Sequence, residues 1–228
     1  MTWQDIGTER DARGQETALR MLDVMAAGLL LVLALPVLAV CAVAIRLDSA
    51  GPILFRQKRV GRGGRPFELL KLRTMVPDAD PAAHRAHVGR LLKRRSGPAW
   101  AKLPVDPRVT RVGRVLRRTG MDELPQLVNV LWGQMSLVGP RPALAYEMAL
   151  WQDWHRARLA VRPGMTGLWQ VDGWGHTSFD EMVRQDLAYI DRRGVRLNLV
   201  ILMRTPAALW RHWANQEPDP NLRPVGGD

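Results

Sequence analysis

The chain has 228 residues, 46% of them hydrophobic, and its 33 Lys and Arg against 22 Asp and Glu give a formal net charge of +11. This composition excludes a disordered tail, and the length suits one ordinary domain or a small domain with a membrane element. The charge favours polyanionic partners: nucleic acid, anionic lipid head groups or phosphate-bearing substrates. Cys41 is the only cysteine, which excludes an intrachain disulfide, and we interpret it as a packing residue.

An uncharged apolar run over residues 24–45 is the first predicted element. It is long enough to span a bilayer core of roughly 30 Å. Pro36 lies near its middle, where proline removes a helical hydrogen bond, so we expect a kink. Cations cluster downstream of the run and Arg20 precedes it, so both ends can lie on the cytoplasmic side. A re-entrant hairpin and an anchor helix merely bent at Pro36 both remain open. Nine Trp against three Phe and two Tyr also favour a membrane interface.

The rest of the chain shows no repeats and no long low-complexity linker, so we expect one globular unit. The best strand candidates, 53–57 and 67–72, form a hairpin around the glycine-rich turn 61–64. Helical periodicity occurs in residues 79–95, 122–132, 143–160, 179–191 and 197–213. The fold class is therefore mainly α with a small β-hairpin. We divide the chain into an N-terminal arm (1–20), a membrane segment (21–46), a globular domain (47–214) and a mobile tail (215–228).

The last predicted helix, 197–213, mixes aliphatic residues with Trp210, Trp213, Arg204 and Arg211. This mixture is typical of a helix that lies in the plane of the lipid head groups. A core helix is the alternative.

Three blocks are rich in functional side chains and interrupted by Gly and Pro, as loops that hold a ligand against backbone often are. The first block, 51–75, contains Lys71 and many cations, which can meet phosphates or form a solvated basic face beside the membrane. The third block, 162–171, runs from Arg162 through two glycines and an indole to Gln170. It can frame a nucleotide or a sugar.

The second block joins residues 106–114, 122–126 and 136–142. Asp122 and Glu123 stand just before Pro125, in the first turn of a predicted helix, where the helix dipole stabilises anions. One carboxylate can attack phosphorus while its neighbour acts as base or metal ligand, although helix capping is the simpler role for such a pair. Arg141, stiffened by two flanking prolines, suits a guanidinium aimed at phosphate oxygens, and a structural turn is the alternative.

Familiar phosphate motifs are missing: the sequence has no P-loop pattern and no dinucleotide fingerprint after a strand. The histidines show no metal-binding spacing, so we interpret all five as surface or packing residues: His84, His87, His155, His176 and His212.

Taken together, the three blocks resemble the bacterial sugar transferase family, the monotopic phosphoglycosyl transferases, over about residues 18–205. The sequence of 122–126, followed at this distance by 136–142, carries the resemblance. It implies a re-entrant helix-break-helix on the cytoplasmic face of the bacterial inner membrane and an interface-embedded transferase domain with amphipathic helices. It also implies Mg²⁺ as cofactor and UDP-sugar, undecaprenyl phosphate and membrane lipids as partners. The chain resembles the small form of the family, without further N-terminal membrane helices.

The resemblance also assigns roles to residues. The family's nucleophilic aspartate falls on Asp122, which also meets the metal, and its partner glutamate falls on Glu123. By resemblance, Asp122 attacks the phosphate attached to the sugar, UMP leaves, and Glu123 helps undecaprenyl phosphate to accept the phosphosugar. The candidates for phosphate contacts are Arg117, Arg141, Arg162 and Lys71, and those for nucleotide or metal support are Asp186 and Gln170.

The sequence departs from the family pattern at Leu35, Gln134 and Asn198, where Ser, Asp and Asp are usual. If a replaced acid binds metal or uridine, activity is altered. Other functions remain as alternatives: a non-enzymatic scaffold and a transferase that passes on the sugar alone. A nucleic-acid binder is disfavoured, because the tryptophans are not interleaved with basic residues. The sugar, the glycan pathway and a homodimer stay open.

Overall fold

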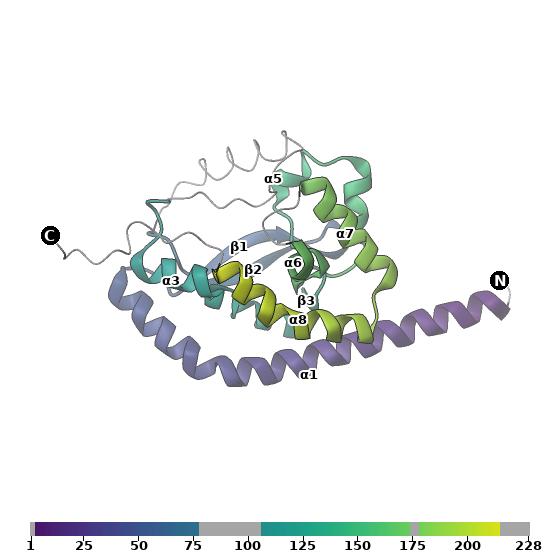
Figure 1. Cartoon of the computed structure of the whole chain (residues 1–228), viewed down its shortest axis with the longest axis horizontal. Helices are drawn as coiled ribbons and strands as arrows, with labels where there is room; N and C mark the ends of the chain where they lie inside the picture. The colour runs from purple at the N-terminus through teal and green to yellow at the C-terminus, as the bar shows by residue number, and fades with distance from the viewer. Residues whose placement is uncertain (1–2, 78–105, 174–177, 215–228) are drawn as a thin grey trace.

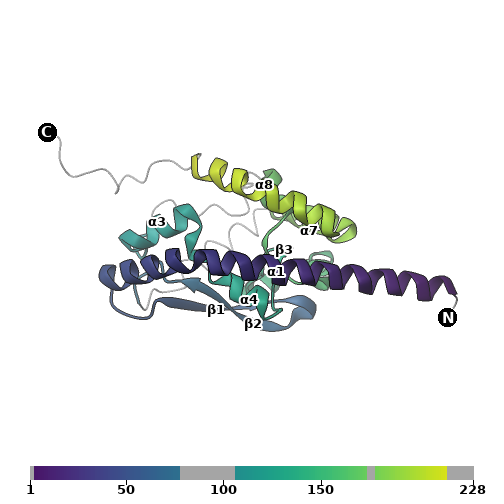
Figure 2. The ribbon, with the colours of Figure 1, turned by 90° about the horizontal axis from the view of Figure 1, so that it is seen from below.

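The computed structural model describes residues 3–77, 106–173 and 178–214. Helix α1 (Trp3–Asp48) runs along one side of a globular body, between the β-hairpin and helix α8 (Figures 1 and 2). The body is built from short helices around two small sheets, which confirms the prediction of a mainly helical fold with a small hairpin. The predicted helix 79–95 and the predicted tail 215–228 lie outside the described residues.

Helix α1 has 46 residues and continues through Pro36. It curves, so that its C-terminal part approaches α3 (Figure 1). By length and composition, its part from Arg13 to Asp48 is the one candidate among the described residues for crossing a membrane. The described part of the predicted arm, residues 3–20, and the membrane segment therefore share one helix. A re-entrant path stays a prediction.

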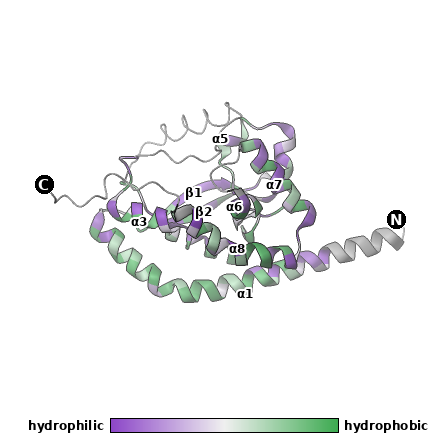
Figure 3. Ribbon diagram, in the orientation of Figure 1, coloured by the Kyte–Doolittle hydropathy of each residue, from purple (hydrophilic) through white to green (hydrophobic). Residues whose placement is uncertain are grey.

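One stripe of α1 packs on the globular body. Its buried residues recur at intervals of four or seven, as one face of a helix requires: Leu19, Asp23, Ala27, Ala34, Cys41 and Ile45. Asp23 is the charged member, and its Oδ1 atom accepts hydrogen bonds of 2.9 Å from both Ser136 Oγ and Leu137 N. Other apolar side chains of the run are exposed, among them Met25, Leu33 and Val40. Figure 3 shows that this part of α1 is hydrophobic along its length. The predicted packing role of Cys41 is confirmed, because it contacts a core cluster with Leu72 and Leu116.

The predicted hairpin is confirmed. Strands β1 (Leu54–Val60) and β2 (Pro66–Leu72) pair antiparallel, with Leu54 opposite Leu72 and Val60 opposite Pro66. The turn η1 (Arg62–Gly64) has Gly63 and Gly64 at positive φ, a conformation that favours glycine. Both strands are longer than the sequence pattern indicated.

The central helices differ from the predictions. Helix α3 (Arg111–Thr119) was not predicted, and the predicted helix 122–132 is a 3₁₀ turn, η2 (Met121–Glu123), followed by α4 (Gln126–Leu131). Gly120, in the left-handed conformation, separates α3 from η2. The predicted helix 143–160 is divided into α5 (Ala145–Met148) and the 3₁₀ segment η3 (Asp153–Ala160), because Gln152 adopts an extended conformation.

The predicted helices near the C-terminal end are confirmed as α7 (Phe179–Arg192) and α8 (Val195–Ala214). They follow the short helix α6 (Leu168–Gly173). In α8, Ile201 and Ala208 are buried, whereas Met203 and Trp210 are exposed. The helix therefore has an inner core face and an outer apolar face, and its predicted place among lipid head groups stays a prediction.

A two-stranded parallel sheet of β3 (Ser136–Val138) and β4 (Gly164–Thr166) was not predicted. It continues past its ends: Gly139 N donates to Thr166 O (2.9 Å) and Gly164 N donates to Pro140 O (2.8 Å). The backbones of Gly139 and Gly164 pack so closely that a Cβ atom on either would overlap the other segment. This pairing brings the second and third sequence blocks together.

Candidate active site

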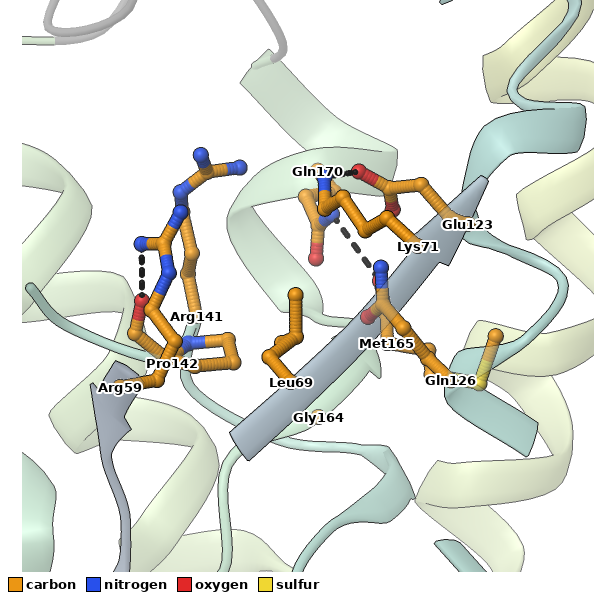
Figure 4. Close-up of a pocket in the computed structure, with 10 residues that line it drawn as sticks. All are labelled: Arg59, Leu69, Lys71, Glu123, Gln126, Arg141, Pro142, Gly164, Met165 and Gln170. Atoms are coloured by element: carbon orange, nitrogen blue, oxygen red, sulfur yellow. Dashed lines mark hydrogen bonds and ion pairs between the residues drawn. The ribbon is translucent and has the colours of Figure 1, made fainter. Parts of the chain in front are cut away.

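A pocket opens where the hairpin, the η2 turn and the loop around Arg141 meet (Figure 4). All three sequence blocks contribute to it, as their functional side chains predict. Its lining consists of Arg59, Leu69, Lys71, Glu123, Gln126, Arg141, Pro142, Gly164, Met165 and Gln170. Four of the residues singled out from the sequence are therefore brought together: Lys71, Glu123, Arg141 and Gln170.

The two adjacent carboxylates lie in the η2 turn, one turn earlier than the helix start to which they were assigned. The reason is local: Gly120 ends α3 and Pro125, which has no backbone N–H, caps α4, leaving 121–123 as a separate 3₁₀ turn. The side chain of Glu123 is half-buried and forms an ion pair with Lys71 Nζ, at 2.8 Å from Oε1. Asp122 is 8% exposed.

Arg117 lies in the last turn of α3, close to the carboxylates. Its Nε atom donates to Thr74 Oγ1 at 2.8 Å. Burial lowers the pKa of the Arg117 guanidinium, and the negative charges of Asp122 and Asp106 oppose this shift. The charge of Asp122 thus acts on Arg117. A phosphate contact by Arg117 stays a prediction.

The loop that carries Arg141 is fixed by its backbone. Four consecutive carbonyl groups, those of residues 140–143, each accept a hydrogen bond. The donors are, in order, Gly164 N (2.8 Å), Arg158 Nη2 (3.4 Å), Arg59 Nη1 (2.9 Å) and Val60 N (2.9 Å). Figure 4 shows the Arg141 side chain beside that of Arg59 on one side of the pocket, with Lys71 and Glu123 on the other.

Arg59 was not singled out from the sequence, because it lies within a basic run that a solvated face explains. It is nevertheless buried, and Gln57 Oε1 accepts from its Nε (3.0 Å) and Nη2 (2.7 Å). Burial lowers its pKa to about 10, assisted by the positive charge of Arg141. The signal that could have identified it is strand alternation: Gln57 and Arg59 face inward, whereas Arg56 and Lys58 are exposed.

Four candidates from the sequence are not among the residues that line the pocket: Asp122, Arg117, Arg162 and Asp186. Arg162 lies against α1, where its Nε donates to Gly133 O (3.0 Å) and its Nη1 pairs with Glu16 (2.8 Å). Asp186 is buried in α7 and forms an ion pair with Arg158. Burial raises the pKa of the Asp186 carboxyl to about 6, against the lowering effect of Arg158. Arg158 also donates a hydrogen bond to the Arg141 carbonyl. Asp186 is therefore connected to the pocket only indirectly, through Arg158.

Two of the three departures from the family pattern form side-chain hydrogen bonds. The Gln134 Oε1 atom accepts from Asn129 Nδ2 at 2.6 Å, and the Asn198 side chain lies 2.9 Å from the Tyr189 hydroxyl. Leu35 lies on the exposed side of α1. None of these three residues lines the pocket.

Among the described residues, no cluster of three or more His, Cys, Asp or Glu side chains could hold a metal ion. Mg²⁺ needs fewer protein ligands, because it commonly binds one or two carboxylates and completes its shell with water and phosphate oxygens. Asp122 and Glu123 provide two adjacent carboxylates and fit this donor set. The predicted Mg²⁺ at Asp122 stays a prediction.

Comparison with known proteins identifies one matching family and several relatives. Residues 14–212 match the bacterial sugar transferase family. A UDP-glucose:undecaprenyl-phosphate glucose-1-phosphate transferase from Caulobacter vibrioides is 46% identical, over 83% of this chain and 68% of the relative. The exopolysaccharide production protein ExoY of Rhizobium meliloti is 35% identical, over 90% of each chain. An undecaprenyl-phosphate galactose phosphotransferase from Salmonella typhimurium is 36% identical, over 84% of this chain and 40% of its own length.

Proposed function

The chain belongs to the bacterial sugar transferase family and is a phosphoglycosyl transferase, and from this premise we propose that it transfers a sugar 1-phosphate from a UDP-sugar to undecaprenyl phosphate. The products are UMP and an undecaprenyl-diphosphate sugar. The observation that carries the proposal is the ion pair of Glu123 with Lys71 at a pocket that Arg141 also lines, next to Asp122. Glucose and galactose are the first donor sugars to consider, because relatives are named for them.

In the first step of the proposed mechanism, Asp122 attacks the phosphorus that bears the sugar. A bond forms between its carboxylate oxygen and phosphorus, and the bond to the bridging oxygen breaks, with its electron pair leaving on UMP. Both reactants are anions, so positive charge at the pocket must offset their repulsion. Lys71 and Arg141 provide that charge.

In the second step, undecaprenyl phosphate enters the site after UMP has left. Glu123 accepts a proton from the carrier phosphate, whose oxygen then attacks the phosphosugar and releases Asp122. The ion pair with Lys71 fixes the position of Glu123 beside the nucleophile. Asp122 and Glu123 would hold Mg²⁺, which when bound supplies further charge neutralisation to the diphosphate.

The long apolar helix supports action at a membrane, where the carrier lipid lies. Met25, Leu33 and Val40 are exposed, so much of α1 is not covered by the described residues. Figure 3 shows the hydrophobic stretch of this helix. Lipid covers such a surface favourably. A re-entrant path of α1 and a location on the cytoplasmic face of the inner membrane belong to the proposal, as does a role in exopolysaccharide assembly, for which the ExoY relative is named.

The deciding experiment is to measure UMP and UDP separately after incubating the detergent-solubilised protein with undecaprenyl phosphate, Mg²⁺ and UDP-glucose or UDP-galactose. We expect UMP that depends on the carrier and disappears in Asp122→Asn. Asp191→Asn, a change on the exposed side of α7, is the matched control and should retain activity. Release of UDP instead, or UMP formation that survives Asp122→Asn, would contradict the proposed mechanism.

A further inference from the structure

Arg59 lines the pocket but has no part in the mechanism above. It is only 6% exposed, and a buried cation is normally paired with a carboxylate. Among the described residues its hydrogen bonds go instead to neutral oxygen atoms, the Gln57 amide and the Pro142 carbonyl. The protein therefore holds a charged group at the pocket without neutralising it through a direct ion pair in the part of the chain that the structure describes.

The geometry of Arg59 leaves donors available. A guanidinium has five N–H groups. The hydrogen bonds above use one on each nitrogen, so each terminal nitrogen keeps one N–H group that no described residue accepts. N–H groups on the two terminal nitrogens of a fixed, planar guanidinium are suited to oxygens of a phosphate group.

The neighbourhood of Arg59 adds a second cation. Arg141 comes from the loop whose Pro142 carbonyl accepts the Arg59 hydrogen bond, so the same contact holds the two side chains next to each other (Figure 4). After burial, the charge of Arg141 is the largest cause of the lowered pKa of Arg59, against smaller opposing effects of Glu147, Tyr146 and Glu123. Two guanidinium groups in the same pocket repel each other, and an anion bound beside both reduces that repulsion.

We propose that Arg59 and Arg141 together bind the phosphate of the leaving nucleotide. This inference rests on the proposed function, and it assigns each of the two phosphates of the donor to its own side of the pocket. Lys71 and Glu123 lie on the other side of the pocket, next to the nucleophile, where the sugar-bearing phosphate reacts. The second phosphate of a UDP-sugar then lies at the arginine pair. When the bridging bond breaks, the pair stabilises the electron pair left on the UMP oxygen, and no proton is required.

A phosphate group could also come from undecaprenyl phosphate, so the test must separate the two sources. Binding of UMP, uridine and farnesyl phosphate is measured by calorimetry on Asp122→Asn protein, which does not turn over. We expect UMP to bind at least about tenfold more tightly than uridine, since charged hydrogen bonds are stronger than neutral ones. Arg59→Lys, added to Asp122→Asn, should reduce this ratio about tenfold and leave uridine and farnesyl phosphate binding unchanged.

Two further variants separate binding from folding. Gln57→Ala removes the hydrogen-bond acceptor that positions the Arg59 side chain but keeps its charge, so the ratio of UMP affinity to uridine affinity should also fall. If Arg59→Lys does not fold, Gln57→Ala provides the test. Arg56→Lys is the matched control, because Arg56 lies on the exposed face of the same strand and pairs with Glu68. It should leave the ratio unchanged.

The inference is overturned if UMP and uridine bind equally well, if the ratio survives both variants, or if the variants weaken farnesyl phosphate binding alone. These outcomes are independent of the proposed function, because turnover of the unchanged protein tests phosphosugar transfer separately.

Discussion

Lys71 and Glu123 are joined by a 2.8 Å ion pair that connects strand β2 to the turn carrying the adjacent Asp122. The two side chains are 19% and 36% exposed, so water screens the pair incompletely. In the proposed mechanism, Lys71 is a cation for the incoming diphosphate and Glu123 is the base. The pair is therefore suited to hold the base in place before either substrate arrives.

We expect Lys71→Met to lower kcat about 100-fold, which is the scale of losing one preorganised charge at a reacting centre. The measurement is the rate of UMP release at saturating donor and carrier. Lys58→Met removes an exposed lysine from the neighbouring strand and should have no effect. An unchanged kcat in Lys71→Met would exclude a part for this lysine in the reaction.

The buried carboxyl of Asp186 should make stability depend on pH. Burial raises its pKa from 3.8 to about 6, despite the opposing influence of Arg158. A carboxyl with a higher pKa in the folded state stabilises the fold at low pH and loses that contribution as the pH rises through the folded pKa. We expect the melting temperature of the unchanged protein to fall relative to Asp186→Asn between about pH 4 and pH 6. Parallel melting curves would show that this carboxyl does not titrate in that range.

The close approach of Gly139 and Gly164 predicts that Gly164→Ala disrupts the β3–β4 pair. The added Cβ would overlap backbone atoms of Gly139, so the loop at Arg141 must shift. We expect a lower melting temperature and loss of UMP release. Gly14→Ala is the control, because no atom lies within 4 Å of its Cβ position, and alanine should stabilise this helical site by up to about 1 kcal/mol. Normal activity in Gly164→Ala would contradict the predicted effect of this contact.

Glu16 joins α1 to three separate segments through ion pairs of 2.8–2.9 Å with Arg62, Arg162 and Arg193. We expect Glu16→Gln to increase hydrogen exchange in residues 13–20, because three cations then lose a common partner. Glu181→Gln, which breaks a single exposed pair with Arg184, should leave exchange in 13–20 unchanged. Equal exchange in both variants would show that the cluster does not hold the helix.

The sequence predicts best those elements whose pattern is local. The hairpin and helices α7 and α8 follow from periodicity. Helix α3 was missed because basic residues occupy much of it, so its buried Leu116 is the main apolar signal. The pairing of β3 with β4 was also missed, because each strand has three residues and its partner lies far along the chain.

The site residues also divide into those that local sequence motifs predict and those whose position depends on the tertiary fold. The carboxylates and Arg141 stand in recognisable motifs, and the pocket contains Glu123 and Arg141. Arg59 was missed because sequence alone does not show which member of a basic run is buried. Arg162 and Asp186 were chosen for their residue types, but their contacts with Glu16 and Arg158 depend on the tertiary fold.

The hydrogen bonds of Asp23 impose an order on biosynthesis. The carboxylate belongs to a helix that is translated before its partners, Ser136 and Leu137, which are 113 and 114 residues further along the chain. A buried carboxylate without partners is unfavourable, so this face of α1 stays hydrated while the intervening residues are translated. This face of the helix can pack on the globular body only after β3 has been translated, so the long apolar helix and the strand that leads to the Arg141 loop reach their final arrangement together.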